Sequence, residues 1–323
     1  MISLSKGAMN VGGAKLYFEN HYSVRDYYTQ DEKFANGYVF GKAAEALGLH
    51  GGSEITAEQF ERLLRGEEPN TGIVLRTKAN HGTTHRAGWD ITLSPPKSVT
   101  LQALVAGDAR LIEAGREAAI YAIEQAEKCA LSRRHGGREW VQTANVVAVM
   151  FEHHQARESI NSKHGPMPQL HHHTFIANLT QRPDGEWRGL EPKEMYKARN
   201  FIDAVYLGDL SRRVQELGYE IQRRSDDRFE LAIYSRAQVE AFSERARDVA
   251  IARKKYGSTD GPLPQELREQ IILETRKPKR DYDPEELRQE HRQLAIEQGI
   301  DLNYRPTAPV RTFAISPAEQ AER

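Results

Sequence analysis

The stretch NVVAVMFEHHQARESINSKHGPMPQLHHHTFIANL, residues Asn145–Leu179, decides the expected fold of this chain. Two runs within it, Asn145–Glu152 and Leu170–Leu179, are rich in Val, Phe, Ile and Thr, which favour β-strands. A loop that contains Pro and Gly, Lys163–Pro168, separates them. This arrangement predicts two neighbouring antiparallel strands.

Histidines gather where these two strands meet the loop. His153 and His154 leave the first run, and His171, His172 and His173 enter the second. Side chains at positions i and i+2 of a strand share a face, about 6.5–7 Å apart. His171 and His173 can therefore bind one ion while His172 points to the other face, and His153 on the adjacent strand is the natural third ligand. The pattern predicts a metal site with open positions for a substrate.

A histidine near a strand end is usually a surface residue or a core residue with a hydrogen-bond partner, so the prediction depends on the whole cluster. The imidazole side chain suits zinc, copper, iron, nickel and manganese, and it accepts magnesium only when oxygen ligands complete the shell. The histidines alone leave the identity of the metal open.

Composition limits the class of protein. The 323 residues are 39% hydrophobic and 28% charged, as in ordinary soluble globular proteins. The single cysteine, Cys129, excludes an internal disulfide framework and fits a reducing compartment. No apolar run is long enough to cross a membrane, and the N-terminus lacks a signal-peptide pattern. We therefore expect a cytoplasmic protein.

The charge balance is neutral overall but uneven along the chain. With 45 basic and 46 acidic residues, the net charge of −1 by itself argues mildly against a nucleic-acid partner. Basic residues nevertheless form two clusters, Lys128, Arg133, Arg134 and Arg138, and Arg212, Arg213, Arg223 and Arg224. Such clusters are commonly solvated faces, so composition does not decide whether the chain binds DNA.

A carboxylate lies on another expected strand. Gly88–Ser94 alternates apolar and polar residues, the Pro95–Pro96 pair ends it, and Lys97–Val105 opens a helix. Asp90 lies between Trp89 and Ile91 in this strand. Asp90 could be a polar residue at a sheet edge, a partner that orients a metal-bound histidine, or a base beside a nucleophile.

Tyrosines cluster near the N-terminus. Tyr17, Tyr22, Tyr27 and Tyr28 fall within twelve residues, although any single one of them could simply pack a helix against the sheet. A phenol has a pKa near 10, so a tyrosine nucleophile needs a nearby base or cation. A metal bound by three histidines could bind a phosphate oxygen and place phosphorus for attack. Together these parts suit the transfer of a DNA phosphodiester onto tyrosine.

The remaining pattern predicts an α+β fold around a central antiparallel sheet flanked by helices. Expected helices cover residues 11–20, 41–49, 56–65, 107–134 and 201–217, with a hairpin over 219–234 and charged helices over 236–256, 264–276 and 283–298. These last helices carry little apolar surface, so we expect them to lie over the sheet. We expect a sheet-based core over about 1–235, a helical part over 236–300, and a linker or tail over 301–323.

At this point the sequence resembles the MobF-type conjugative relaxases, which are HUH endonucleases. The resemblance rests on FEHHQAR…PQLHHHTFIANL, GWDITLSPPKSVT and the early AKLYFE…DYY, which occur in order. It covers about residues 1–300. It implies a bacterial cytoplasmic nickase and strand transferase that acts on one strand at a plasmid transfer origin. It further implies that accessory relaxosome proteins and the conjugation secretion machinery are partners, and that the C-terminal helices close over single-stranded DNA.

The resemblance also implies roles for individual residues. Tyr17 matches the tyrosine that takes the 5′-phosphate, and Tyr27 or Tyr28 the one used at termination. His153, His171 and His173 match the metal ligands, for magnesium or manganese, with zinc, nickel or cobalt able to substitute in vitro. Asp90 matches the aspartate that orients a histidine and assists deprotonation of the tyrosine.

The match departs from the family pattern in the tyrosine region. Phe18 stands where relaxases usually have a second tyrosine. The spacing to Asp26-Tyr27-Tyr28 is about two residues longer than expected, and Tyr22 lies between, so the second nucleophile stays open among Tyr22, Tyr27 and Tyr28. Lys97 and Arg157 are candidates for phosphate contact by charge and position.

Two other functions remain open from the sequence. One is a single-stranded DNA-binding module with a structural metal, although structural zinc commonly uses more cysteines than this chain has. The other is an H-x-H metal-dependent hydrolase or oxygenase, which leaves the tyrosine cluster without a role.

Overall fold

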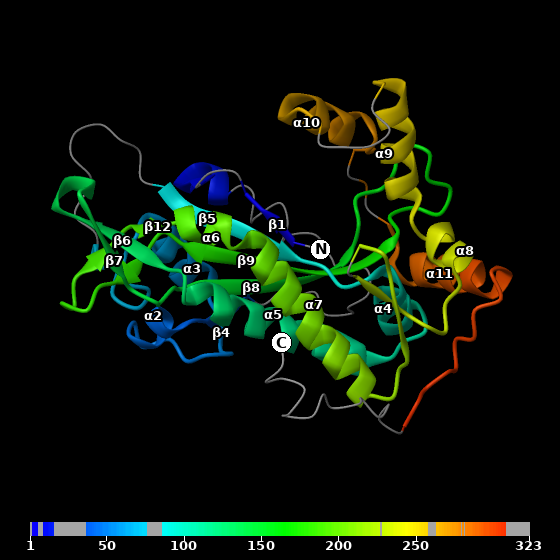
Figure 1. Cartoon of the computed structure of the whole chain (residues 1–323), viewed down its shortest axis with the longest axis horizontal. Coiled ribbons are helices and arrows are strands. Elements are labelled where there is room, and N and C mark those ends of the chain that lie inside the picture. The colour runs from blue at the N-terminus through cyan, green and yellow to red at the C-terminus, as the bar shows by residue number, and fades with distance from the viewer. Residues whose placement is uncertain are drawn as a thin grey trace, which may run out of the picture.

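A central antiparallel sheet organises the structure. The computed structural model describes residues 2–5, 9–15, 37–75, 86–226, 228–257, 263–278, 280 and 282–307. Among these residues the main sheet has seven strands in the order β1-β5-β9-β8-β3-β4, with β2 also paired to β5. The strands are β1 (Ile2–Leu4), β2 (Met9–Asn10), β3 (Gly37–Phe40), β4 (Glu54–Ile55), β5 (Arg86–Leu93), β8 (Ala148–Gln155) and β9 (Pro168–Ala177). This confirms the predicted α+β class (Figure 1).

The register of the three central strands decides which side chains meet. His153 on β8 lies opposite His171 on β9, and Thr92 on β5 lies opposite His173. Paired residues of antiparallel strands point to the same face, so the predicted ligands share one face of the sheet. β8 continues to Gln155, so His153 and His154 lie within the strand rather than after it.

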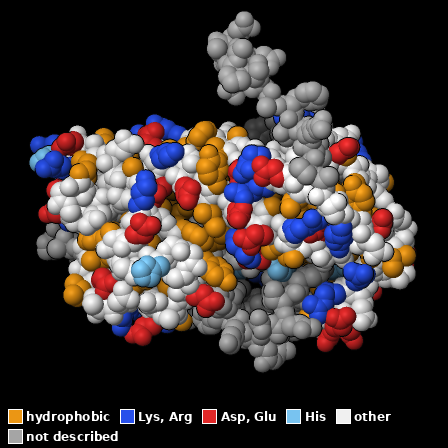
Figure 2. Space-filling view, turned by 90° about the horizontal axis from the view of Figure 1, so that it is seen from below, with side chains coloured by type: hydrophobic (Ala, Val, Ile, Leu, Met, Phe, Trp, Pro, Cys, Tyr) orange, Lys and Arg blue, Asp and Glu red, His pale blue; other side chains and the backbone are white. Residues whose placement is uncertain are grey.

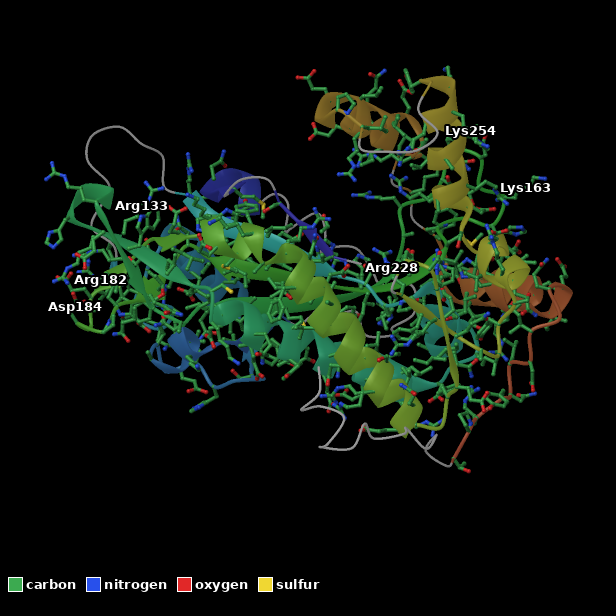
Figure 3. The ribbon with its side chains drawn as sticks, viewed as in Figure 1. Arg133, Lys163, Arg182, Asp184, Arg228 and Lys254 are labelled. Carbon is green, nitrogen blue, oxygen red and sulfur yellow. The ribbon has the colours of Figure 1, made fainter. Side chains whose placement is uncertain are left out.

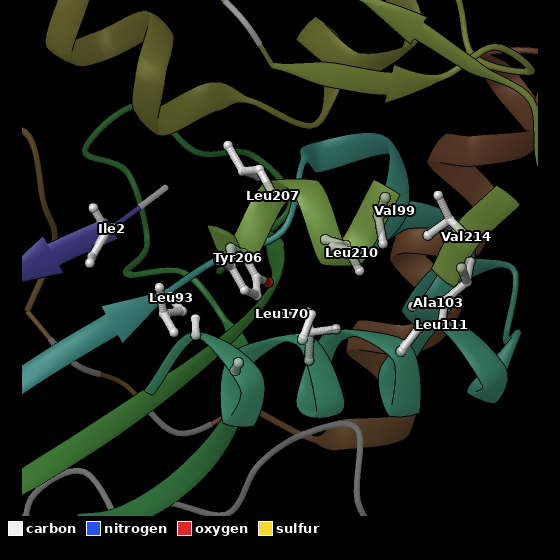
Figure 4. Close-up of a cluster of buried hydrophobic side chains, with 14 of the residues drawn as sticks. Ile2, Leu93, Val99, Ala103, Leu111, Leu170, Tyr206, Leu207, Leu210 and Val214 are labelled. Carbon is white, nitrogen blue, oxygen red and sulfur yellow. The ribbon is translucent and has the colours of Figure 1, made fainter. Parts of the chain in front are cut away.

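Two long helices cover the opposite face. α5 (Ala109–Glu127) and α7 (Arg199–Glu216) pack on each other and on the sheet (Figure 1). Figure 4 shows Leu111 of α5, Leu170 of β9 and Leu210 of α7 in one buried cluster. Full burial of each such leucine stabilises the fold by about 1.5–3 kcal/mol. Small residues let α5 approach closely, since a Cβ at Gly115 would lie only 3.4 Å from Leu170 Cδ2.

The face that carries the histidines has its own apolar cluster. Phe60 of α3 (Ala57–Arg65) meets Phe151 and Phe175 edge to face, with ring centroids 5.5 and 5.4 Å away. The predicted start of this helix is confirmed, because Thr56 caps it and Gln59 completes a capping box. Ala14, in a helical segment over residues 11–15, belongs to the same cluster.

Two predicted helices are shorter than expected. The helix over 41–49 is only α2 (Lys42–Glu45), and Gly48 follows it with a φ of 68°. The helix predicted from Gly107 begins after its N-cap Asp108 and ends at Glu127.

The end of that predicted helix is a strand instead. Leu131–Arg134 forms β6, which pairs with β7 (Glu139–Gln142) and β12 (Leu190–Glu191). The prediction was wrong because Gly136 and Gly137 adopt positive φ angles and turn the chain into a hairpin.

The segment after Pro96 is helical, but its hydrogen bonding changes along its length. α4 (Lys97–Thr100) continues directly into η1 (Leu101–Val105), a π-helical turn whose residues are all buried. The predicted helix over 97–105 is therefore confirmed, with an irregular second half.

The remaining elements are short strands and the C-terminal helices. They are η2 (His135–Gly137), β10 (Thr180–Gln181), β11 (Trp187–Arg188), β13 (Ile221–Arg223), β14 (Phe229–Leu231), α6 (Lys193–Lys197), α8 (Arg236–Ala241), α9 (Glu244–Lys255), α10 (Gln265–Glu274) and α11 (Pro284–Glu297). The helix predicted over 236–256 is thus two helices. α11 packs beside η1, whereas α9 and α10 pack on each other. α9 and α10 project beyond the sheet in Figure 1, so the prediction that these two helices lie over the sheet was wrong. Among the described residues, no helix has both the length and the apolar character to cross a membrane.

Candidate metal centre

Three histidine rings converge on one face of the sheet. The ring centroids of His153, His171 and His173 lie 5.2 Å (153–171), 5.0 Å (153–173) and 5.0 Å (171–173) apart. One nitrogen from each ring lies within 4.8 Å of the other two, which is the arrangement that a shared ion requires. The strand register therefore produces the predicted cluster without any contribution from a loop.

Backbone contacts orient His171. Its Nδ1 lies 2.8 Å from the carbonyl oxygen of Gln169. A carbonyl oxygen can only accept a hydrogen bond, so Nδ1 carries the proton and Nε2 keeps its lone pair. This is the tautomer that binds a metal through Nε2.

Asp90 performs the same task for His173. Its Oδ2 accepts a hydrogen bond from His173 Nδ1 at 2.8 Å and another from Thr92 Oγ1 at 3.1 Å. A carboxylate that holds the outer nitrogen of a metal-binding histidine fixes the ring and makes it a stronger ligand. Asp90 is 7% exposed, so this contact is sheltered from water. Of the alternatives considered for Asp90, the geometry supports the orienting role.

Electrostatics keep His171 neutral. Its pKa falls to about 3, because burial disfavours the charged ring and His173 lies beside it. A neutral imidazole is the form that binds metal. The donor set of three imidazoles, two with their outer nitrogens engaged, therefore fits a divalent ion and leaves coordination positions for oxygen ligands.

A second polar cluster lies on the other face of the same two strands. Glu152 accepts hydrogen bonds from His154 Nε2 at 2.9 Å and from His172 Nε2 at 3.3 Å. Arg116 of α5 donates to the same carboxylate at 3.1 Å (Nε) and 3.0 Å (Nη2). Burial by itself would raise the pKa of Glu152, but the hydrogen bonds from the two histidines hold it far below its ordinary value.

This cluster was not predicted from the sequence. Its signal was present, because strand alternation places Glu152, His154 and His172 on the face opposite the predicted ligands. The partner Arg116 belongs to a distant helix, and no local pattern points to it.

The remaining candidate residues have different positions. Tyr17, Tyr22, Tyr27 and Tyr28 lie outside the described residues. The ammonium group of Lys97 donates to the carbonyl oxygen of Pro168 at 2.7 Å, and burial lowers its pKa to about 8 although Glu230 favours the charged form. Lys97 therefore holds the start of β9 in this structure.

Arg157 lies in the loop after β8 and is half-buried.

The described acidic and basic side chains are interspersed on the face shown in Figure 2, with no continuous basic surface there. Figure 3 shows Arg133 and Arg182 at one end of the molecule and Lys163 and Lys254 at the other.

Arginines of the two predicted basic clusters have acidic partners. Arg133 pairs with Glu191 at 2.5 Å and stacks over Trp140 at 5.3 Å. Arg212 and Arg213 both pair with Asp209. These arginines therefore behave as the solvated, paired faces that the sequence analysis considered.

The fold and the histidine site together define a class of protein with a candidate metal centre on the central strands of an antiparallel sheet. The family described as TrwC relaxase matches residues 11–298. This chain belongs to that family.

Curated relatives and solved structures agree with this assignment. The multifunctional conjugation protein TraI of Escherichia coli is 34% identical over 321 residues, and TraI of strain K12 is 34% identical over 322 residues. Each alignment covers 93% of this chain, which spans 17% of the length of these relatives.

Structures of the conjugative relaxase TrwC share the fold. A copper-bound structure in complex with oriT DNA has a TM-score of 0.81 at 34% identity, covering 94% of this chain and 100% of that one. A metal-bound complex with oriT DNA has a TM-score of 0.80, also at 34% identity and with the same coverage. A complex with a 27-mer that comprises the recognition hairpin and the cleavage site has a TM-score of 0.79 at 33% identity, again covering 94% of this chain and 100% of that one.

Proposed function

We propose that this chain is a metal-dependent DNA relaxase, a site- and strand-specific nickase and strand transferase that acts at a plasmid transfer origin. The observation that carries the proposal is the His153–His171–His173 cluster, oriented by Asp90, on the fold of relaxases solved with oriT DNA. Residues 1–300 form the relaxase part, with the sheet-based core over about 1–235 and the helical part over 236–300.

In the proposed reaction, the phenol oxygen of Tyr17 attacks the phosphorus of the cleaved phosphodiester. The new bond is the 5′-phosphotyrosyl ester, the bond from phosphorus to the 3′ oxygen breaks, and that oxygen leaves with a proton as a 3′-hydroxyl. Because one phosphoester replaces another, the reverse attack by a 3′-hydroxyl rejoins the strand. Tyr27 or Tyr28 performs the second transfer.

A divalent ion, magnesium or manganese in the cell, supplies charge withdrawal from the phosphate oxygens when it is bound. The protein's own part is to hold the three imidazoles at one point. Gln169 fixes the ring of His171, and Asp90 fixes the ring of His173.

The packing of Ala14 supports the assignment of Tyr17. Ala14 is fully buried in the apolar cluster that contains Phe151 and Phe175. Those two phenylalanines lie two residues from His153 and His173, on the same face of their strands. The chain thus passes over the histidine face three residues before Tyr17.

The proposed partners follow from this reaction. They are single-stranded origin DNA, accessory relaxosome proteins and the secretion machinery of conjugation. Arg157 contacts the DNA, and Lys97 does so once it releases the carbonyl oxygen of Pro168 at the start of β9. The proposed location is the bacterial cytoplasm.

The test is covalent capture. Wild type and Tyr17→Phe are mixed with a panel of single-stranded origin oligonucleotides and manganese, then denatured and separated by size. We expect a protein–DNA adduct with wild type and none with Tyr17→Phe, while DNA affinity stays nearly unchanged.

The other outcomes are also informative. An adduct that persists in Tyr17→Phe would move the nucleophile to Tyr22, Tyr27 or Tyr28. Tight binding with no adduct for any oligonucleotide or metal would replace the relaxase proposal with a single-stranded DNA-binding function.

A further inference from the structure

The pairing of the two strands that carry the proposed metal ligands becomes irregular just beyond His153 and His171. The ladder between β8 and β9 is regular up to His153 opposite His171, and its register shifts before the next pair, Gln155 opposite Pro168. Proline has no backbone N–H and cannot donate to the ladder. The regular ladder therefore ends at the His153–His171 pair, and beyond the irregularity the backbone N–H of Ala156 donates to the carbonyl oxygen of Met167 at 2.9 Å.

Side chains on the opposite face bridge this position. Glu152 precedes His153, and it lies directly opposite His172, which separates His171 from His173. The Glu152 carboxylate bonds His172 across the strands and His154 along its own strand. One carboxylate thus joins residues adjacent to all three proposed ligands.

The same carboxylate is tied to the helix layer. Arg116 of α5 donates to Glu152 through two of its nitrogens. α5 also lies close to the strand here, since a Cβ at Gly115 would be 3.6 Å from His172 Cε1. His172 is fully buried and the Glu152 side chain is 17% exposed, so solvent screens these bonds only weakly.

We propose that Glu152 is a positioning residue for the metal centre, acting from the far face of the sheet through His172, His154 and Arg116. It holds β8 in place against β9 and α5, so that the ring of His153 stays at the point where His171 and His173 converge. The inference rests on the proposed metal site.

The main test is the affinity for manganese, measured by calorimetry on the full chain without DNA. Glu152→Gln keeps the size of the side chain but removes its charge and one acceptor oxygen. We expect its manganese affinity to fall about 10-fold, in the range found when groups that orient metal ligands are removed. Circular dichroism should show that the variant remains folded.

Glu113→Gln is the matched control. Glu113 accepts from the same Arg116 at 2.6 Å, and its side chain is 53% exposed on α5. We expect manganese affinity within twofold of wild type. An equal loss in both variants would show a general effect of α5 and overturn the positioning role.

A double variant tests the route through His172. Because Glu152 acts in part through this ring, Glu152→Gln combined with His172→Leu should lose less affinity than the sum of the two single losses. Fully additive losses, or wild-type affinity in folded Glu152→Gln, would overturn the proposal.

Hydrogen exchange on the wild type provides a test that needs no variant. If the side chains hold the irregular end, the amides of His153 and His171 should exchange as slowly as those of Val149 and Phe151. Exchange at least tenfold faster at the two histidines would overturn the proposal. A wild-type chain that binds no manganese would overturn the metal site itself, which separates the two failures.

Discussion

At the scale of single residues, two of the three rings have a defined proton position. The carbonyl of Gln169 and the carboxylate of Asp90 both accept from an Nδ1, which leaves Nε2 of His171 and His173 for a metal. The neutral form of His171 is maintained at physiological pH by burial and by the neighbouring ring. For His171, both charge and tautomer are thus set before any ion binds.

Removal of one ligand should weaken metal binding and strand cleavage together. In His171→Ala, two imidazoles remain, and we expect manganese affinity to fall at least 10-fold in calorimetry, with a parallel loss of adduct formation. The exposed His50 provides the control, since His50→Ala should bind manganese as wild type does. Unchanged affinity in His171→Ala would remove this residue from the ligand set.

At the scale of elements, the absence of a side chain at Gly88 lets two strands and an aromatic ring approach closely. A Cβ at Gly88 on β5 would lie 2.1 Å from the carbonyl oxygen of Ile176 and 2.6 Å from the ring of Phe175. β5 can therefore approach β9 closely at this point. That approach sets the distance between Asp90, two residues further along β5, and His173 on β9.

Gly88→Ala should accordingly destabilise the protein. The added methyl group must push β5 from β9 or displace Phe175, and we expect a loss of about 1–3 kcal/mol in the free energy of unfolding. Urea denaturation at constant m-value measures it.

Gly208→Ala is a control for which we expect the opposite change in the free energy of unfolding. Gly208 lies in α7, and a Cβ there would meet no atom within 4 Å. Alanine should stabilise that helix by about 0.5–1 kcal/mol. If both variants changed stability by the same amount, close packing at Gly88 would not be the reason for its glycine.

At the scale of the whole molecule, the loop after β8 connects the metal strands to the projecting helices. Asp248 of α9 accepts from Ser159 Oγ at 2.6 Å and from the Asn161 backbone at 3.2 Å. The backbone of Ile160 donates to Thr275, at the end of α10. Together with the ion pair between Lys277 and Glu158 at 2.7 Å, these polar bonds join α9 and α10 to the loop after β8.

Asp248→Ala should therefore loosen α9 without affecting the metal centre. Ser159 would lose a buried acceptor, at a cost of about 1–3 kcal/mol to local stability. We expect faster hydrogen exchange throughout α9 and manganese affinity within twofold of wild type. Slow exchange in α9 would show that other contacts hold the helix.

Glu240→Ala is the control for that change, because Glu240 pairs with Arg236 on the surface, where ion pairs contribute little.

The pKa of Asp248 gives a second test. Burial alone would raise it, but hydrogen bonds from Ser159 and Asn161 hold it below its ordinary value. The contribution of Asp248 is therefore present above about pH 4 and lost as the pH falls through its folded pKa, so wild type and Asp248→Ala should converge in acid.

The sequence by itself determined the features that depend on local periodicity. The alternation of side chains along a strand placed His171 and His173 on one face and His172 on the other, and the Pro pair after Ser94 ended β5 where predicted. The capping box at Thr56 located α3 for the same reason, since all its atoms lie within one turn of helix. From these local signals the fold class and the three histidines could be predicted.

Only the tertiary structure decided what long-range packing controls. Residues 131–134 continue a helical pattern, but pairing with β7 and β12 makes them a strand. Arg116 and Glu152 are separated by 36 residues, and they meet because α5 packs behind β8. The register that places His153 opposite His171 likewise requires both strands at once. Such contacts join segments that are far apart in the sequence, and the local composition of one segment does not indicate its partner. A single sequence therefore predicts the ligands of this site but not the side chains behind the sheet that hold them in place.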